Sequence, residues 1–398
     1  MKPADLLVRM DPKYLASMFP RRKHESMKGY DAAAEAFNEY VLCKFGELRE
    51  KDLVEFRKHA NDFLRRVEAE SVPFKADRVI PIVRFQKVLA TSPPSLQSLF
   101  PLKFTKELIK ITNFNTTINI FLIQEVVKAV VQAEETYCEI LPYAQNSRVI
   151  TEAKLQDFVL KRYLLRMAEP VESVRYFAAY IVGIIFFVLG ARRKETVNLQ
   201  DLLASTLLWH LERSTVSYNE EDVKEVDVFT ESSFTTCLNE FRALDADRDG
   251  VLSREELVGH FRNREYTKRF LMRVMDISSL YDGCMDFKGY IDLFCAIRFR
   301  HTKASAKYHF EAFDVKGDGV LDEGELEYMI GLQIENLVGE NDKDREFAQQ
   351  LLFELKDQLQ MKGKTMTVAE FVSRKEQVEF SNIITSYVAY RNYENRES

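Results

Sequence analysis

Apolar residues recur along this chain in pairs whose members stand five positions apart, among polar residues and glycines. Eight such pairs occur: Ile80 with Phe85, Ile118 with Ile123, Ile150 with Leu155, Val197 with Leu202, Leu252 with Leu257, Met285 with Tyr290, Leu321 with Leu326, and Met366 with Phe371. The intervals between them are close to the roughly 30 to 40 residues of one helix–loop–helix unit. The pattern predicts eight units in four pairs, in which the first apolar residue belongs to a short strand that meets a neighbouring loop.

One predicted loop, residues 245–256, carries a complete set of oxygen ligands for calcium. The twelve-residue loop of an EF-hand needs ligands at positions 1, 3, 5, 7, 9 and 12 and a glycine at position 6. Gly250 occupies position 6, and the ligand positions hold Asp245, Asp247, Asp249, Val251 (through its carbonyl), Ser253 (through a water) and Glu256. The sequence therefore predicts a Ca²⁺ site here, with a relic loop that folds without metal as the alternative.

A second loop, residues 314–325, keeps the glycine and most ligands of this template but has Lys316 at position 3. The remaining ligands are Asp314, Asp318, Val320, Asp322 and Glu325. An ammonium group has no lone pair with which to coordinate a metal ion, and its charge repels a nearby cation. We expect weaker calcium binding here than in the first loop, or a loop braced by an ion pair between Lys316 and its own carboxylates.

These patterns predict an all-α protein, an elongated array of paired EF-hand units, most of them degenerate, with short loop–loop β contacts. The expected organisation is an N-terminal helical region of unknown role (1–74), a degenerate EF-hand-like helical domain (75–215), an acidic linker (216–232), an EF-hand pair with the intact calcium loop (233–300), and a second EF-hand pair with the C-terminal tail (301–398). The uncharged stretch 176–191 is shorter than the roughly 20 residues of a membrane span. We expect it to form a buried helix.

Composition narrows the range of functions. The net charge is −6 over 398 residues, so no general attraction to nucleic acid or to anionic membranes is expected. The five cysteines show no CxxC spacing and the N-terminal residues lack the apolar core of a signal peptide, which favours a cytoplasmic or nuclear protein with reduced thiols. No HExxH, P-loop, GxGxxG or GxSxG motif occurs, so we expect no catalytic residue and no cofactor other than Ca²⁺.

The order of motifs resembles a known family. The calcium loop LDADRDGVLSREEL is followed by YDGCMDFKGYIDLFCAI and the chain ends in YENRES, with the degenerate loops and the apolar helix upstream. This arrangement is similar to the B″ regulatory subunits of protein phosphatase 2A, and most similar to the gamma-type branch that includes the plant FASS-like proteins. The resemblance covers roughly residues 75–398 and leaves the first 70 residues unmatched.

The resemblance implies a non-catalytic regulatory and targeting subunit. Such subunits dock on the helical-repeat scaffold and on the catalytic subunit of the phosphatase, and they direct it to phosphoprotein substrates. Gamma-type members are associated with centrosomes, basal bodies and cortical microtubules, and calcium at the EF-hands can tune the docking. The alternative is a free-standing EF-hand calcium sensor or adaptor that exposes a groove for target helices.

Overall fold

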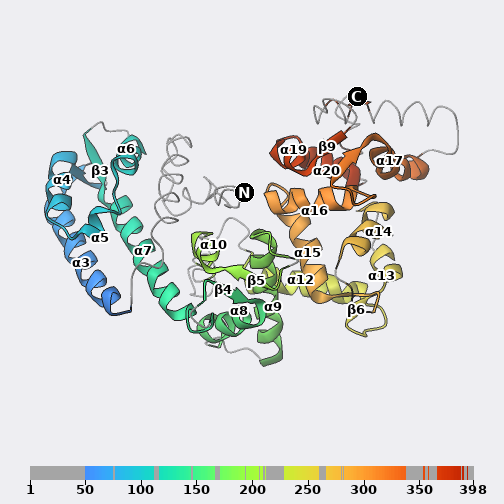
Figure 1. Cartoon of the computed structure of the whole chain (residues 1–398), viewed down its shortest axis with the longest axis horizontal. Coiled ribbons are helices and arrows are strands. Elements are labelled where there is room, and N and C mark those ends of the chain that lie inside the picture. The colour runs from blue at the N-terminus through green and yellow to red at the C-terminus, as the bar shows by residue number, and fades with distance from the viewer. Residues whose placement is uncertain are drawn as a thin grey trace. The chain divides into compact units, whose positions relative to one another are not determined.

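A computed structural model of the chain describes residues 50–74, 77–111, 116–144, 147–165, 171–192, 194–205, 228–259, 266–278, 282–337 and 365–386, with a few isolated positions beside these ranges. Helices predominate, and the strands are short (Figure 1). The chain forms two compact units: Met1–Arg166 with Arg193–Tyr218, and Met167–Arg192 with Asn219–Ser398. Most of the predicted region 1–74 and of the predicted linker 216–232 lies outside the described residues.

The first unit contains three strands in one sheet, two strands in another, and the helices around them. Its elements are α3 (Glu50–Ala69), β1 (Val72–Phe74), β2 (Asp77–Pro81), α4 (Ile82–Ala90), α5 (Pro94–Gln97), α6 (Leu102–Ile111), β3 (Thr117–Asn119), α7 (Ile120–Ile140), β4 (Val149–Thr151), α8 (Glu152–Val159), the π-helical turn η2 (Leu160–Leu164), β5 (Thr196–Asn198) and α10 (Leu199–Ala204). Phe63, Phe85 and Phe100 pack against one another in the core of this unit.

The second unit holds both candidate calcium loops. Its elements are α9 (Val171–Val188), α12 (Glu231–Leu244), β6 (Val251–Leu252), α13 (Arg254–Gly259), α14 (Lys268–Ile277), β7 (Met285–Asp286), α15 (Phe287–Arg298), α16 (Lys303–Phe313), β8 (Val320–Asp322), α17 (Glu323–Leu337), β9 (Thr365–Thr367), α19 (Val368–Ser373) and α20 (Gln377–Thr385). Phe313, Phe371 and Phe380 form the aromatic core beside the second loop.

The eight apolar pairs seen in the sequence occupy equivalent places in the structure. Their first members are Cα partners in antiparallel strands: Ile80 with Ile118, Ile150 with Val197, Leu252 with Met285, and Leu321 with Met366. All sixteen side chains of the eight pairs are buried. The predicted contacts between strands of neighbouring loops are therefore present, two in each unit.

The residue after each buried strand position starts the next helix. Asn119, Thr151, Asn198, Asp286 and Thr367 each accept a hydrogen bond from a backbone N–H in the first turn of the following helix. Such caps satisfy N–H groups that the helix itself leaves without a partner. An oxygen-bearing side chain therefore caps the helix even in units that have no metal ligands elsewhere; α4, whose N-cap is Pro81, is the exception.

Most of the apolar stretch 176–191 lies in α9, which ends at Val188. Tyr180, Ile184 and Ile185 are fully buried, as the sequence predicts. None of the described helices has the length and hydropathy required to cross a bilayer. The sequence grouped this stretch with residues 75–215, whereas the structure packs α9 against α15 in the second unit. A Cβ atom at Gly183 would lie 2.9 Å from Cγ2 of Ile291, so glycine permits this close approach of the two helices.

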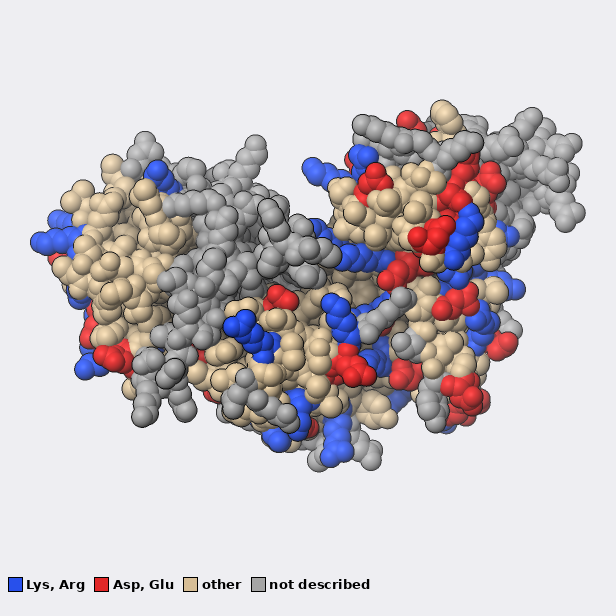
Figure 2. All heavy atoms as spheres, in the orientation of Figure 1, with Lys and Arg blue, Asp and Glu red and all other residues tan. Residues whose placement is uncertain are grey.

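Charged side chains of both signs are interspersed over the described part of the face in Figure 2. This mixture agrees with the mild net charge of the chain, −6.

Candidate calcium-binding loops

The first loop connects α12 to α13 and contains β6. Helix α12 ends at Leu244, and Asp245 follows as its C-cap with φ −71° and ψ 83°. The chain then turns through two residues in the left-handed region, Arg248 (φ 63°) and Gly250 (φ 87°). Glycine adopts this conformation without a steric cost, so the sharp turn falls where the calcium-loop template requires it.

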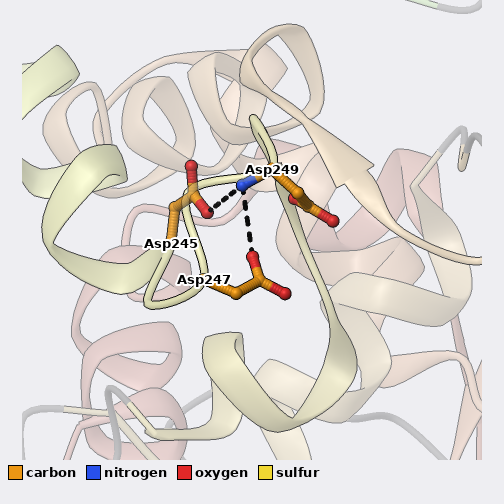
Figure 3. Close-up of side chains that lie close together, drawn as sticks. All are labelled: Asp245, Asp247 and Asp249. Carbon is orange, nitrogen blue, oxygen red and sulfur yellow. Dashed lines mark hydrogen bonds between the residues drawn. The ribbon is translucent and has the colours of Figure 1, made fainter.

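Three carboxylates of this loop converge. Asp245, Asp247 and Asp249 each offer an oxygen, and these oxygens all lie within 4.8 Å of one another. The backbone N–H of Asp249 donates to Oδ1 of Asp245 (3.1 Å) and to Oδ1 of Asp247 (3.2 Å), and Figure 3 shows the two carboxylates on either side of this amide. A compact group of oxygens held by the backbone suits a hard cation such as Ca²⁺.

Glu256, at position 12, is held from both sides. Its Oε1 accepts a hydrogen bond from the N–H of Ala246 (2.8 Å), and its Oε2 accepts from the N–H (2.9 Å) and the hydroxyl (2.8 Å) of Ser253. Burial acts to raise the pKa of Glu256, but the hydrogen bonds from Ser253 and Ala246 outweigh it and leave the pKa below its usual range. The carboxylate is therefore ionised at neutral pH, as a metal ligand must be.

The second loop, between α16 and α17, is organised in the same way. Asp314 is buried, and its carboxylate accepts hydrogen bonds from the N–H groups of Gly317 (2.7 Å), Asp318 (3.2 Å) and Gly319 (2.8 Å). Glu325 is also buried and accepts from the N–H of Lys316 (2.9 Å) and of Asp322 (3.0 Å).

Lys316 gives the second loop a different electrostatic character. Its ammonium group forms an ion pair with the carboxylate of Asp322, across the loop from position 3 to position 9. The hydrogen bond to Asp322 raises the pKa of Lys316, and the same bond lowers the pKa of Asp322. This is the internal ion pair considered for the loop on sequence grounds. Among the described residues, the compact acidic group occurs in the first loop only.

Two features of the loops were missed in the sequence. The side chain at position 9 acts as a helix cap: Ser253 Oγ accepts from the N–H of Glu256 (3.3 Å), and Asp322 Oδ1 accepts from the N–H of Glu325 (3.0 Å). The recurrence of polar residues one position after seven of the eight buried strand residues is a signal that would have found it; the exception is Pro81. In addition, Arg273 of α14 donates to the backbone carbonyl of Asp314, a contact between distant residues that no local pattern indicates.

Family models match most of the chain. They describe an RSA-1 N-terminal domain over residues 31–134, an RSA-1 middle domain over residues 145–230, and an RSA-1 C-terminal domain over residues 245–398. The C-terminal domain includes both candidate loops. The N-terminal match extends into residues 31–74, for which the sequence motifs gave no resemblance.

A regulatory subunit of protein phosphatase 2A from Caenorhabditis elegans, rsa-1, is 38% identical over 394 residues, which cover 97% of this chain and 96% of that protein. The human B″ subunit gamma of the same phosphatase is 25% identical over 259 residues, covering 63% of this chain and 57% of that protein.

A chain from a solved PP2A PR70 holoenzyme (diCa) superposes with a TM-score of 0.53 at 18% sequence identity, covering 65% of this chain and 98% of that one. This similarity concerns the fold. The names of the sequence relatives describe regulatory subunits, which favours that role over a free-standing sensor and over an enzyme. With the family models and the full-length similarity to rsa-1, they show that the chain belongs to the RSA-1 family of protein phosphatase 2A regulatory subunits.

Proposed function

We propose that this regulatory subunit binds Ca²⁺ through residues 245–256. The supporting observation is the convergence of three carboxylate oxygens within 4.8 Å on a backbone that already has the required turn at Gly250. The ligands would be Asp245, Asp247, Asp249, the carbonyl of Val251, Ser253 through a water, and Glu256. The bound ion would offset part of the negative charge of these carboxylates and join the ends of α12 and α13.

The second loop is a weaker site in this proposal. Asp314, Asp318, the carbonyl of Val320, Asp322 and Glu325 would provide its ligands. The ion pair between Lys316 and Asp322 already supplies a positive charge to the loop, and calcium must displace it. The PR70 holoenzyme, a protein of similar fold, is named as a diCa form, which agrees with two calcium ions in that protein.

The paired helix–strand–helix segments further support an array of EF-hand pairs, most of which have lost their ligands. Four of the five strand pairings among the described residues join the residues expected at position 8 of an EF-hand loop. Units without ligands would serve as a helical scaffold that presents an extended surface to partner proteins.

We further propose that this surface docks on the scaffold and catalytic subunits of protein phosphatase 2A and directs the enzyme to phosphoprotein substrates. Membership in the RSA-1 family and the fold similarity to a chain from a PP2A holoenzyme support this assignment. From the resemblance to the gamma-type branch, we infer a cytoplasmic location at centrosomes, basal bodies or microtubules. Fluorescent tagging of the full chain tests the location, and a diffuse signal throughout the cell cycle would contradict it.

The decisive experiment is affinity purification of the tagged full chain with calcium and with a chelator, followed by identification of the co-purifying chains. We expect the scaffold and catalytic subunits in both preparations, with a yield that changes with calcium. The Glu256→Gln variant should behave in calcium as the unaltered chain does in chelator. Recovery of neither subunit under gentle conditions would overturn the docking proposal. The same yield with calcium and with chelator would show that docking does not depend on calcium.

A further inference from the structure

Helix α14 lies between the two candidate loops. It follows α13 of the first loop and packs against α13, and it also packs against α16 and α17, which flank the second loop (Figure 1). Its N-cap residue Thr267 donates its backbone N–H to the carbonyl of Thr385 (2.9 Å), at the end of α20. α14 is therefore fixed to the second pair of units at its start and contacts both loops' helices along its length.

Arg273 joins α14 to the start of the second loop. Its Nε donates to the carbonyl of Ala312 (3.1 Å) and its Nη2 to the carbonyl of Asp314 (2.8 Å). These are among the last carbonyls of α16, which have no partner within the helix, and a cation is favourable at this end. The Arg273 side chain is only 13% exposed. Because Asp314 occupies position 1 of the second loop, Arg273 fixes the backbone from which the first ligand of that loop projects.

The same arginine is linked to the first loop through one carboxylate. Nη1 of Arg273 donates to Oδ2 of Asp276 (3.1 Å), and Nη2 of Arg254 donates to Oδ1 of the same carboxylate (2.8 Å). Arg254 also donates to the carbonyl of Met272 (3.3 Å). It is the first residue of α13 and stands between the loop residues Ser253 and Glu256. We call Arg254, Asp276 and Arg273 the interloop bridge.

We propose that the interloop bridge couples the two candidate calcium loops, so that a shift at the start of α13 changes the backbone of Asp314. Arg273 is a positioning residue for the second loop, supplied by a helix that follows the first. Strand pairing joins each loop to its own partner, whereas the bridge joins loops of different pairs. The response to an ion rests on the proposed calcium binding, but the contacts themselves are present without it.

The shape of the guanidinium group is essential to this arrangement. Arg273 uses three different nitrogens for three acceptors, and a lysine ammonium on a flexible chain cannot hold the same planar geometry. Asp276 uses both oxygens, one for each arginine. An asparagine at position 276 would offer one oxygen and a nitrogen that cannot accept, so it would leave one arginine without its acceptor.

Amide hydrogen exchange of the calcium-free full chain tests the bridge directly. In Asp276→Asn and in Arg273→Lys, we expect exchange over residues 314–322 to become roughly threefold or more faster, within the range of coupling between contacting residues. Glu255→Gln, which removes an exposed carboxylate from the same turn as Arg254, is the matched control and should leave these residues unchanged. Unaltered exchange over 314–322 in both bridge variants would overturn the proposal.

A second measurement follows the coupling when calcium is added. In a chain that carries Asp318→Asn to weaken the second loop, calcium at the first loop should still slow exchange over residues 314–322. Adding Asp276→Asn should remove this slowing while calorimetry still records calcium binding. Slowing that survives Asp276→Asn would overturn the coupling. If calorimetry records no heat of calcium binding, the proposed calcium site is refuted instead. The hydrogen exchange of the calcium-free chain then tests the interloop bridge by itself.

Discussion

The two candidate loops share one backbone and differ in their charges. Asp245 and Asp314 cap their helices with φ −71° in both and ψ 83° and 84°. Each carboxylate accepts hydrogen bonds from the N–H groups four and five residues later, at 3.1 and 3.1 Å in the first loop and at 3.2 and 2.8 Å in the second. The loops diverge at position 3, where one has Asp247 and the other Lys316.

This comparison separates the folding of such a loop from its affinity for an ion. Backbone N–H groups satisfy the carboxylates at positions 1, 5 and 12 in both loops, so the conformation has internal support whichever residue stands at position 3. We expect the residue at position 3 to set the affinity: an aspartate attracts a cation, whereas Lys316 already places a positive charge in the loop. The predictions below change one loop and use the other as its reference.

The largest effect is expected when the glutamate at position 12 is neutralised. Glu256→Gln should abolish most of the calcium binding measured by calorimetry, because this residue provides two of the oxygens of the site. Glu325→Gln, the same change in the second loop, should leave the stronger binding step in place. If Glu256→Gln leaves the heat signal as it was, the first loop is not the stronger site.

Acid should loosen the second loop before the first. Burial, with a smaller contribution from the charge of Arg300, lowers the pKa of His309 in α16 to about 4 from its ordinary 6.5, although its hydrogen bond to the Ser305 carbonyl opposes this. At a pH between these two pKa values, His309 binds a proton in the unfolded chain but not in the folded chain. Stability should therefore fall as pH drops from 6.5 to about 4, by roughly 3 kcal/mol.

Hydrogen exchange as a function of pH measures this loss. Protection of α16 should decrease across the acidic window while that of α12, the helix before the first loop, changes less. His309→Phe keeps a ring to stack on Phe270 and removes the titrating group, so its pH profile should be flatter. Equal loss of protection in α12 and α16 would contradict this account.

Exchanging the residues at position 3 should exchange the behaviour of the loops. Lys316→Asp completes the ligand set and frees Asp322, so the affinity of the second loop should rise by about tenfold or more. Asp247→Lys should weaken the first loop by a similar factor. Calcium titration of both variants measures the two steps; unchanged affinities would show that position 3 does not set the difference.

The smallest effect concerns position 4 of the loops. Arg248 has φ 63° in the first loop, and Gly317 has φ 70° in the second. A non-glycine residue in this region is strained, but glycine also makes the unfolded chain more flexible, so Arg248→Gly should stabilise the protein by only about 0.5 kcal/mol. Calcium-free thermal unfolding measures it, and a marked loss of stability would show that the Arg248 side chain makes an important contact.

The sequence predicted the local features of these loops because they depend on local chemistry. An apolar residue at position 8 must be buried where strands meet, and a glycine must occupy the turn, so Leu252 and Gly250 could be placed in advance. Arg273 could not, because its partner Asp314 lies 41 residues away and nothing in the local sequence distinguishes it from an arginine that faces solvent. The packing of α9 against α15 could not be predicted for a related reason. A run of apolar residues predicts that a helix is buried but does not identify the helix it packs against.

The placement of α9 has a consequence for shortened forms of the protein. The chain passes between its two units three times, after Arg166, Arg192 and Tyr218. A product that begins after residue 218 would keep both candidate loops and lose α9, including Phe177, whose ring stacks on Phe234 at 5.0 Å. Such a product would expose an apolar face on α12 and α15. A fragment cut after residue 218 should therefore aggregate or be degraded, although it contains every proposed calcium ligand.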